Sequence, residues 1–316
     1  MGENKRKTKS RKRGRITMSA LIWVVGGAGI FTGSSAAALY GFTVKAQRPR
    51  LVPNDNVPPV PYEEAEWHSE GKKVKGWFLV HSHPDGGSDP GPVVVIAHGW
   101  GSNRSRVLRY ALPLYEEGYS ILMYDARSHG ESDYYRTPTG LQFRDDLMAA
   151  IEWLRQRPET DPTRIGVVGH SLGGFGAVLA LDVGAPIAAL VTDSMPVRLS
   201  TMIGAELKRR KLPQFPLARI IPKIMVWRSG ISQSMLRRAN PVRILHDNTR
   251  NRKTPVLLVH SRNDRFIPAS ELKLILARTP ELPHLFVDAE GHSASDRDPA
   301  FWPAVTAFFQ HSLQKK

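Results

Sequence analysis

A serine at the junction of a predicted strand and a predicted helix is the residue of this sequence best suited to covalent chemistry. It lies in the run Gly169-His170-Ser171-Leu172-Gly173-Gly174, between the apolar residues 165–168 and an apolar helix predicted over 172–182. Small residues two positions on either side of Ser171 allow a tight, strained turn that exposes the hydroxyl above the edge of a sheet. A hydroxyl held in this way can attack a carbonyl carbon. The alternative interpretation is a glycine-rich turn in which the serine only caps the helix.

Four further motifs occur in a fixed order around the serine. The segments 98–101 (His-Gly-Trp-Gly) and 125–132 (Asp-Ala-Arg-Ser-His-Gly-Glu-Ser) each follow an apolar run, as do the pairs Asn263-Asp264 and Gly291-His292. With the chain order Ser, Asp, His, residues 62–316 resemble the α/β-hydrolase superfamily of serine hydrolases, including membrane-anchored bacterial esterases and lysophospholipase-like enzymes. The resemblance implies an α/β fold, with a mostly parallel central sheet, helices on both faces and a helical lid insert.

A serine hydroxyl is a poor nucleophile at neutral pH and needs a base within hydrogen-bond reach. We assign this role to His292, which follows the last predicted strand; the alternative is a solvated loop histidine. Asp264 would orient the imidazole and stabilise its cationic form. It could instead be a turn aspartate without a catalytic role. Asp193, at the end of the preceding predicted strand, is the rival for the acidic position.

The tetrahedral intermediate of acyl transfer needs amide donors that are already in place. We expect them to be the N–H groups of Leu172, directly after the serine, and of Trp100, in the loop after the predicted strand 93–97; Gly101 could replace Trp100. The chain contains no cysteine, which excludes thiolate nucleophiles, Cys-ligated zinc and iron–sulfur clusters. The expected chemistry requires neither a cofactor nor a metal ion.

These residues can meet only if several strands end at one edge of a sheet. Hydrophobic residues make up 41% of the chain and charged residues 23%, which favours a globular fold over disorder or a polytopic membrane protein. Short apolar runs alternate with longer amphipathic stretches, a pattern typical of a parallel sheet covered by helices. The predicted strands are 74–80, 93–97, 120–124, 165–169, 188–192, 256–260 and 285–287, and the predicted helices are 104–117, 141–156, 172–182, 270–277 and 299–312.

The amino terminus is strongly basic and precedes a long uncharged stretch. Residues 1–15 contain eight Lys/Arg and one acid, whereas residues 16–44 contain no charge. We expect a basic cytoplasmic tail and then a transmembrane anchor, with the catalytic domain outside the cytoplasm. The alternative is a cleaved signal peptide and a secreted protein, because Ala36-Ala37-Ala38 fits the A-x-A pattern. Five prolines in residues 45–61 predict an extended linker before a folded domain that starts near Tyr62.

The net charge of +15 is concentrated in the tail and in one later segment. Residues 198–253 hold fourteen Lys/Arg against two acids, and the segment 197–253 is far longer than an ordinary crossover, so we interpret it as a helical lid insert. Cationic amphipathic helices bind anionic lipid, so this lid could rest near the membrane or admit substrates with acidic heads. The alternative is a merely solvated charged surface. Nucleic acid is not an expected partner, because the sequence has no nucleic-acid-binding motif.

The sequence thus favours a serine hydrolase that cleaves carboxylic esters of acyl or lipid-like substrates through Ser171, His292, Asp264 and an acyl-enzyme intermediate. One alternative is a peptidase or amidase that uses the same three residues. Another is a non-catalytic lipid- or surface-binding module, because a fold does not by itself establish an activity.

Overall fold

The computed structural model describes residues 36–81 and 90–314. The chain divides into two units, Met1–Val44 and Lys45–Lys316. The predicted basic tail and most of the predicted anchor lie outside the described residues. Among the described residues, 36–46 form a helix. Of the helices in the described ranges, none combines the length and the hydropathy needed to cross a bilayer.

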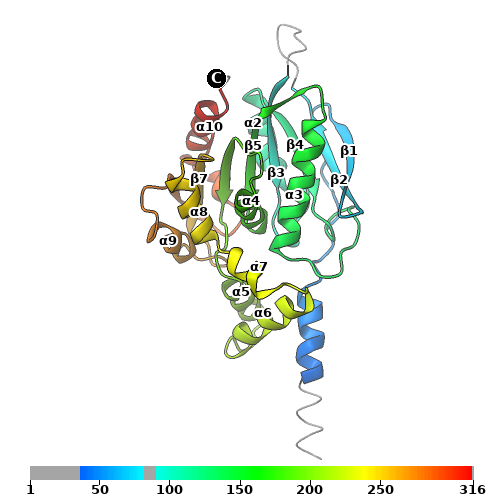
Figure 1. The fold of residues 1–316 in the computed structure, drawn as a ribbon, viewed down its shortest axis with the longest axis vertical. Coiled ribbons are helices and arrows are strands. Elements are labelled where there is room, and N and C mark those ends of the chain that lie inside the picture. Colours follow the sequence, from blue (N-terminus) through cyan, green and yellow to red (C-terminus); the bar gives the residue numbers. More distant parts are fainter. Residues whose placement is uncertain (1–35, 82–89, 315–316) are drawn as a thin grey trace, which may run out of the picture. The chain divides into compact units, whose positions relative to one another are not determined.

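An eight-stranded sheet forms the centre of the second unit (Figure 1). Its strand order is β1-β2-β4-β3-β5-β6-β7-β8; β2 runs antiparallel to both β1 and β4, and every other pair is parallel. The mostly parallel α/β sheet predicted from the sequence is confirmed, with all seven predicted strands and one additional edge strand, β1. The bounds are β1 Glu63–Ser69, β2 Lys72–Leu79, β3 Gly91–Ala97, β4 Ser120–Asp125, β5 Thr160–His170, β6 Ala189–Asp193, β7 Val256–Asn263 and β8 His284–Glu290.

Helices cover both faces of the sheet, as predicted (Figure 1). Side chains of α3, α4, α8 and α9 share one hydrophobic core with one face, and side chains of α2 and α10 share a second core with the other. Along β3, Val93 and Val95 belong to the first core and Val94 and Ile96 to the second, as expected for a strand buried on both sides. The bounds are α2 Leu108–Glu116, α3 Gly140–Arg155, α4 Leu172–Asp182, α8 Pro241–Arg250, α9 Ser270–Leu276 and α10 Phe301–Ser312.

The predicted helical insert lies between β6 and β7, but its last helix has a different role from the one expected. Helices α5 (Leu199–Arg209), α6 (Leu217–Arg228) and α7 (Gln233–Arg238) gather at one end of the sheet (Figure 1). The fourth helix, α8, packs against α4 and buries Ile244 and Leu245 in the first core. Because α8 covers the sheet like the other crossover helices, the lid consists of α5 to α7 and is shorter than the predicted 197–253.

The proline-rich residues 45–61, which we call the strap, were predicted to be an extended linker before the folded domain. After the helix that ends at residue 46 they form neither helix nor strand, but they are packed against the domain. The buried side chain of Gln47 donates a hydrogen bond to Ser229 Oγ of the lid (3.0 Å), and Asn103 Nδ2 donates to the backbone oxygen of Val52 (2.9 Å). The folded unit therefore begins before residue 62, because polar groups distant in the sequence hold the strap in place.

Candidate active site

Ser171 occupies a strained turn between β5 and α4. Its φ of 52° and ψ of −118° are rare for a residue with a side chain, and its N–H donates to the backbone oxygen of Asp193 on β6 (2.8 Å). The flanking glycines make this turn sterically feasible. A Cβ on Gly173 would lie 2.2 Å from the backbone oxygen of Ala97, and one on Gly169 would also collide with backbone atoms. The sequence therefore supplies glycine where the chain leaves no room for a side chain.

The structure brings the hydroxyl of Ser171 and the side chains of His292 and Asp264 together. His292, in the loop after β8, places Nε2 2.9 Å from Ser171 Oγ and Nδ1 2.7 Å from Asp264 Oδ2. Gly291, with a φ of 101°, lets the chain turn sharply before the histidine. The carboxylate of Asp264 is fully buried, whereas the His292 side chain is 19% exposed. The three groups thus form one hydrogen-bonded line from the core to a partly open surface.

Asp264 is both a turn residue and a hydrogen-bond partner of His292. Its Oδ1 accepts hydrogen bonds from the N–H groups of Phe266 and Ile267, both at 2.8 Å, while Oδ2 faces His292. These amide donors fix the orientation of the carboxylate. Because both of its oxygens are occupied, the acid is held in one position toward the imidazole.

Asp193, the rival acid, has other partners. Its Oδ2 accepts a hydrogen bond from the hydroxyl of Tyr110 (2.5 Å), and its Oδ1 accepts one from Ser194 Oγ (3.1 Å). Burial and the negative charge of Asp193 raise the pKa of Tyr110 well above its usual value, so the tyrosine remains a donor. The Nδ1 atom of His292 is already engaged by Asp264, so the geometry leaves Asp193 in a separate network behind the serine turn.

His170 takes part in the site in a way that sequence reasoning did not identify. It is buried directly before Ser171, and its Nε2 lies 2.9 Å from the backbone oxygen of His292. Burial, reinforced by the positive charges of His292 and Arg109, lowers the pKa of His170 well below 6.5. The ring is therefore neutral at physiological pH. Because a carbonyl oxygen only accepts, the proton of the neutral ring belongs on Nε2. The only sequence signal for this role was the position of His170 beside the serine.

The predicted oxyanion donors lie on two segments that border the serine. Leu172 opens α4, so its N–H has no partner one turn earlier in the helix. Gly99, directly before Trp100, approaches so closely that a Cβ there would lie 2.9 Å from Ser171 Cβ. The turn is held by buried His98, whose Nδ1 donates to the Gly99 oxygen (2.7 Å) and whose pKa burial lowers to about 4.

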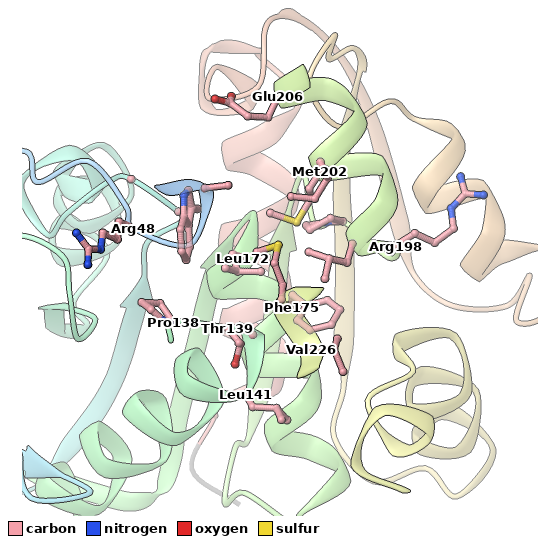
Figure 2. A pocket seen from close by; sticks show the side chains of 18 of the residues that line it. Arg48, Pro138, Thr139, Leu141, Leu172, Phe175, Arg198, Met202, Glu206 and Val226 are labelled. Atoms are coloured by element: carbon pink, nitrogen blue, oxygen red, sulfur yellow. The ribbon is translucent and has the colours of Figure 1, made fainter. Parts of the chain in front are cut away.

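A cavity of about 860 Å³ adjoins these segments and lies within the size range of small-molecule sites. Trp100 and Leu172 belong to its lining, together with Phe175 of α4 and with Met202 and Val226 of the lid (Figure 2). The described part of the chain also contributes seven Lys/Arg and one glutamate to the lining, so apolar side chains are combined with an excess of cations. Among residues 36–81 and 90–314, no group of three or more His, Cys, Asp or Glu side chains could hold a metal ion.

Comparisons with known proteins agree with this architecture. An uncharacterized protein of Mycobacterium tuberculosis is 36% identical over 152 residues, which are 48% of this chain and 50% of that protein. The chain thus spans about half the length of that relative. The uncharacterized protein YqkD of Bacillus subtilis is 25% identical over 228 residues, 71% of this chain and 70% of that protein.

The fold also has a solved counterpart. An esterase of Pyrococcus furiosus is 25% identical, with a TM-score of 0.66, over 85% of this chain and 97% of that one. A family model described as the alpha/beta hydrolase family matches residues 93–314, a range that includes the serine turn, the aspartate turn and the histidine loop. Because that match covers most of the chain, the protein belongs to the alpha/beta hydrolase family.

Proposed function

We propose that the protein is a serine hydrolase that cleaves carboxylic esters. The observation that carries the proposal is the unbroken hydrogen-bonded line from Ser171 Oγ through His292 to Asp264, at 2.9 and 2.7 Å. In the first half-reaction, His292 Nε2 removes the hydroxyl proton as Ser171 Oγ bonds to the acyl carbon. The same proton then passes to the departing alcohol, and the acyl-enzyme remains.

In the second half-reaction, water gives one proton to His292 and bonds to the acyl carbon. The bond to Ser171 Oγ then breaks, the proton returns to the serine, and the carboxylic acid leaves. Asp264 orients the ring and stabilises its cationic form in both halves. The N–H groups of Leu172 and Trp100 stabilise the negative oxygen of each tetrahedral intermediate.

The cavity supports acyl or lipid-like substrates. Apolar side chains such as Phe175, Leu179, Met202 and Val226 dominate the part near Leu172. A hydrocarbon chain can be buried there without loss of hydrogen bonds, whereas a peptide would bring backbone polar groups that need partners. The Pyrococcus furiosus protein with the same fold is named an esterase, which agrees with this preference.

Labelling with a fluorophosphonate probe tests the proposal on the full chain. Wild type should react, and Ser171→Ala should not. Ser128→Ala is a matched control, because Ser128 also has a positive φ (66°) in a turn. Hydrolysis of an ester and an amide with the same acyl group then distinguishes the two proposed activities. Faster ester cleavage supports an esterase, and preferential amide cleavage indicates a peptidase or amidase. Absence of labelling in wild type would indicate a non-catalytic module.

We further propose that residues 16–44 anchor the protein in a membrane, with residues 1–15 in the cytoplasm and the hydrolase domain outside it. The chain has no cysteine, so a single introduced cysteine is a unique label. In intact cells, a membrane-impermeant maleimide should label Ser234→Cys, which is exposed in the lid, and not Thr8→Cys. Equal labelling of both would contradict this orientation, and a mature chain that lacks residues 1–38 would indicate a secreted protein.

We also propose that the lid contacts lipid. Phe215, before α6, is 73% exposed, and Trp227 near the end of that helix is 72% exposed. The exposed Lys223 lies between them, and such a mixture of aromatic and cationic side chains is typical of helices at a lipid surface. For the test, proteolysis first releases the hydrolase domain of the full chain from its anchor, and binding of the released domain to anionic vesicles is then measured. Phe215→Ser with Trp227→Ser should weaken this binding. Unchanged binding would contradict the proposal.

A further inference from the structure

The cavity beside Ser171 has cations on opposite sides of its apolar lining. Arg48 of the strap and Arg198 of the lid lie on opposite sides of the apolar side chains around Leu172 (Figure 2). The positive residues of the lining differ in whether a carboxylate already neutralises them, and this difference identifies where a ligand charge could bind.

On the lid side the cations are paired. Arg198 donates to Glu271 at 2.6 Å, and that carboxylate is fully buried. Glu206, the one acid among the described residues of the lining, accepts hydrogen bonds from Arg209 and Arg210 at 2.8 and 2.5 Å. The arginine donors keep the pKa of Glu206 below its usual value. This side of the cavity therefore has its charges balanced by the protein itself.

The other side holds three arginines without such partners. Arg48 and Arg50 belong to the strap, and Arg106 belongs to the short 3-10 helix Ser105–Val107. All three are exposed lining residues, and within residues 36–81 and 90–314 no carboxylate forms an ion pair with them. Like charges that share one margin repel one another, so a bound anion would relieve the repulsion.

This arrangement is fixed by hydrogen bonds on both sides of the arginines. Before Arg48, the side chain of Gln47 is fully buried and is bonded to the lid. After Arg50, Asn103 Nδ2 donates to the Val52 oxygen at 2.9 Å, while Asn103 Oδ1 accepts the N–H of Arg106 at 3.1 Å. One buried asparagine thus joins the strap to the segment that carries Arg106.

We propose that Arg48, Arg50 and Arg106 bind the anionic head of an amphiphilic ester whose hydrocarbon chain fills the apolar part of the same cavity. This inference rests on the proposed ester hydrolysis at Ser171. Guanidinium groups bind phosphate and carboxylate oxygens through paired N–H donors, and the adjacent apolar lining suits a chain attached to such a head. The substrate class is therefore an ester of an anionic amphiphile rather than a neutral fat.

Binding to the full chain carrying Ser171→Ala tests the site without a need for turnover. The probes are decyl phosphate and its neutral dimethyl ester, both titrated below their micelle concentrations by calorimetry. The variant Arg48→Gln/Arg50→Gln/Arg106→Gln should weaken decyl phosphate binding by about tenfold or more and change binding of the neutral ester by less than about threefold. The control Lys208→Gln/Lys211→Gln/Arg237→Gln removes the same charge from exposed lid positions outside the cavity and should change neither.

Equal binding of decyl phosphate by all variants would overturn the proposal, as would a parallel loss for both probes in the arginine variant. Inorganic phosphate that binds as tightly as decyl phosphate would also overturn it, because the hydrocarbon chain would then contribute nothing. Failure of the proposed function is a separate result. It would appear as absence of Ser171-dependent hydrolysis of a neutral ester, whatever the binding data show.

Discussion

The ring of His170 donates a hydrogen bond to the backbone oxygen of His292 over 2.9 Å. The bond joins residues that are 122 positions apart and connects the serine turn to the loop that carries the proposed base. The lowered pKa of His170 keeps its ring neutral, and the carbonyl oxygen, which can only accept, fixes the proton of that ring on Nε2. His170 is therefore a positioning residue for His292.

Replacement of His170 separates positioning from packing. His170→Phe keeps a ring but removes the donor, and a shift of the histidine loop by about 1 Å could lower kcat by up to about 100-fold. KM should change little, because the ring is buried and is not part of the cavity lining. His170→Asn retains an N–H donor and should recover most of the activity per site, counted by fluorophosphonate titration. Equal losses in the two variants would contradict the role of this hydrogen bond.

The two acids near the site give a matched pair of variants. Asp264→Asn removes the charge that stabilises the cationic ring and that fixes its tautomer, so kcat should fall by about 10³ to 10⁴-fold. Its amide oxygen can still accept the N–H groups of Phe266 and Ile267, which preserves the turn. Asp193→Asn should reduce kcat per titrated site by less than about tenfold, because Asp193 faces Tyr110 instead. The reverse order of effects would make Asp193 the functional acid.

Local patterns predicted most of the sheet. Strand β1 was missed because Glu63–Ser69 is an edge strand rich in charged residues, and only Ala65, Trp67 and Ser69 are buried. Its period-two alternation is the signal that could have identified it. The chain order of serine, acid and histidine, each after a predicted strand, was sufficient to predict that Ser171 and His292 lie at one edge of the sheet.

Contacts between distant segments could not be predicted in the same way. The prolines of the strap predicted extended backbone, but nothing local indicates that Asn103 holds Val52 or that Gln47 binds the lid. The positive charge of residues 198–253 likewise concealed that Ile244 belongs to the core, because composition does not say which face of a helix meets a sheet. The role of His170 depends on one such long-range contact.

The glycine after the serine turn should tolerate no side chain. In Gly173→Ala, the new Cβ would lie 2.2 Å from the backbone oxygen of Ala97, which cannot move freely because β3 is paired with a strand on each side. Overpacking of this kind costs about 1–3 kcal/mol, and loss of fluorophosphonate labelling should accompany it because the turn must shift. Gly204→Ala in α5 is the control: its nearest contact is at 3.5 Å, and alanine favours a helix by up to about 1 kcal/mol. The urea concentration at the unfolding midpoint should therefore fall for Gly173→Ala and rise for Gly204→Ala. Similar destabilisation by both substitutions would contradict the steric argument.

Buried histidines with lowered pKa values should make the fold sensitive to acid. Burial lowers the pKa of His98 from 6.5 to about 4, and burial together with the nearby His98 lowers that of His129 from 6.5 to about 3. Between these values and pH 6.5 the unfolded chain binds more protons than the folded one. The free energy of unfolding is thus highest above about pH 6.5 and falls as the pH decreases, by about 1.4 kcal/mol per pH unit for each histidine.

His129→Asn removes the titrating ring but can keep a donor toward the Arg127 oxygen, which lies 3.0 Å from the histidine Nδ1. The free energy of unfolding of this variant, measured by urea denaturation from pH 7.5 to 5, should decline less steeply than that of wild type by about one histidine's share. Identical slopes would show that His129 is not the group that takes up the proton.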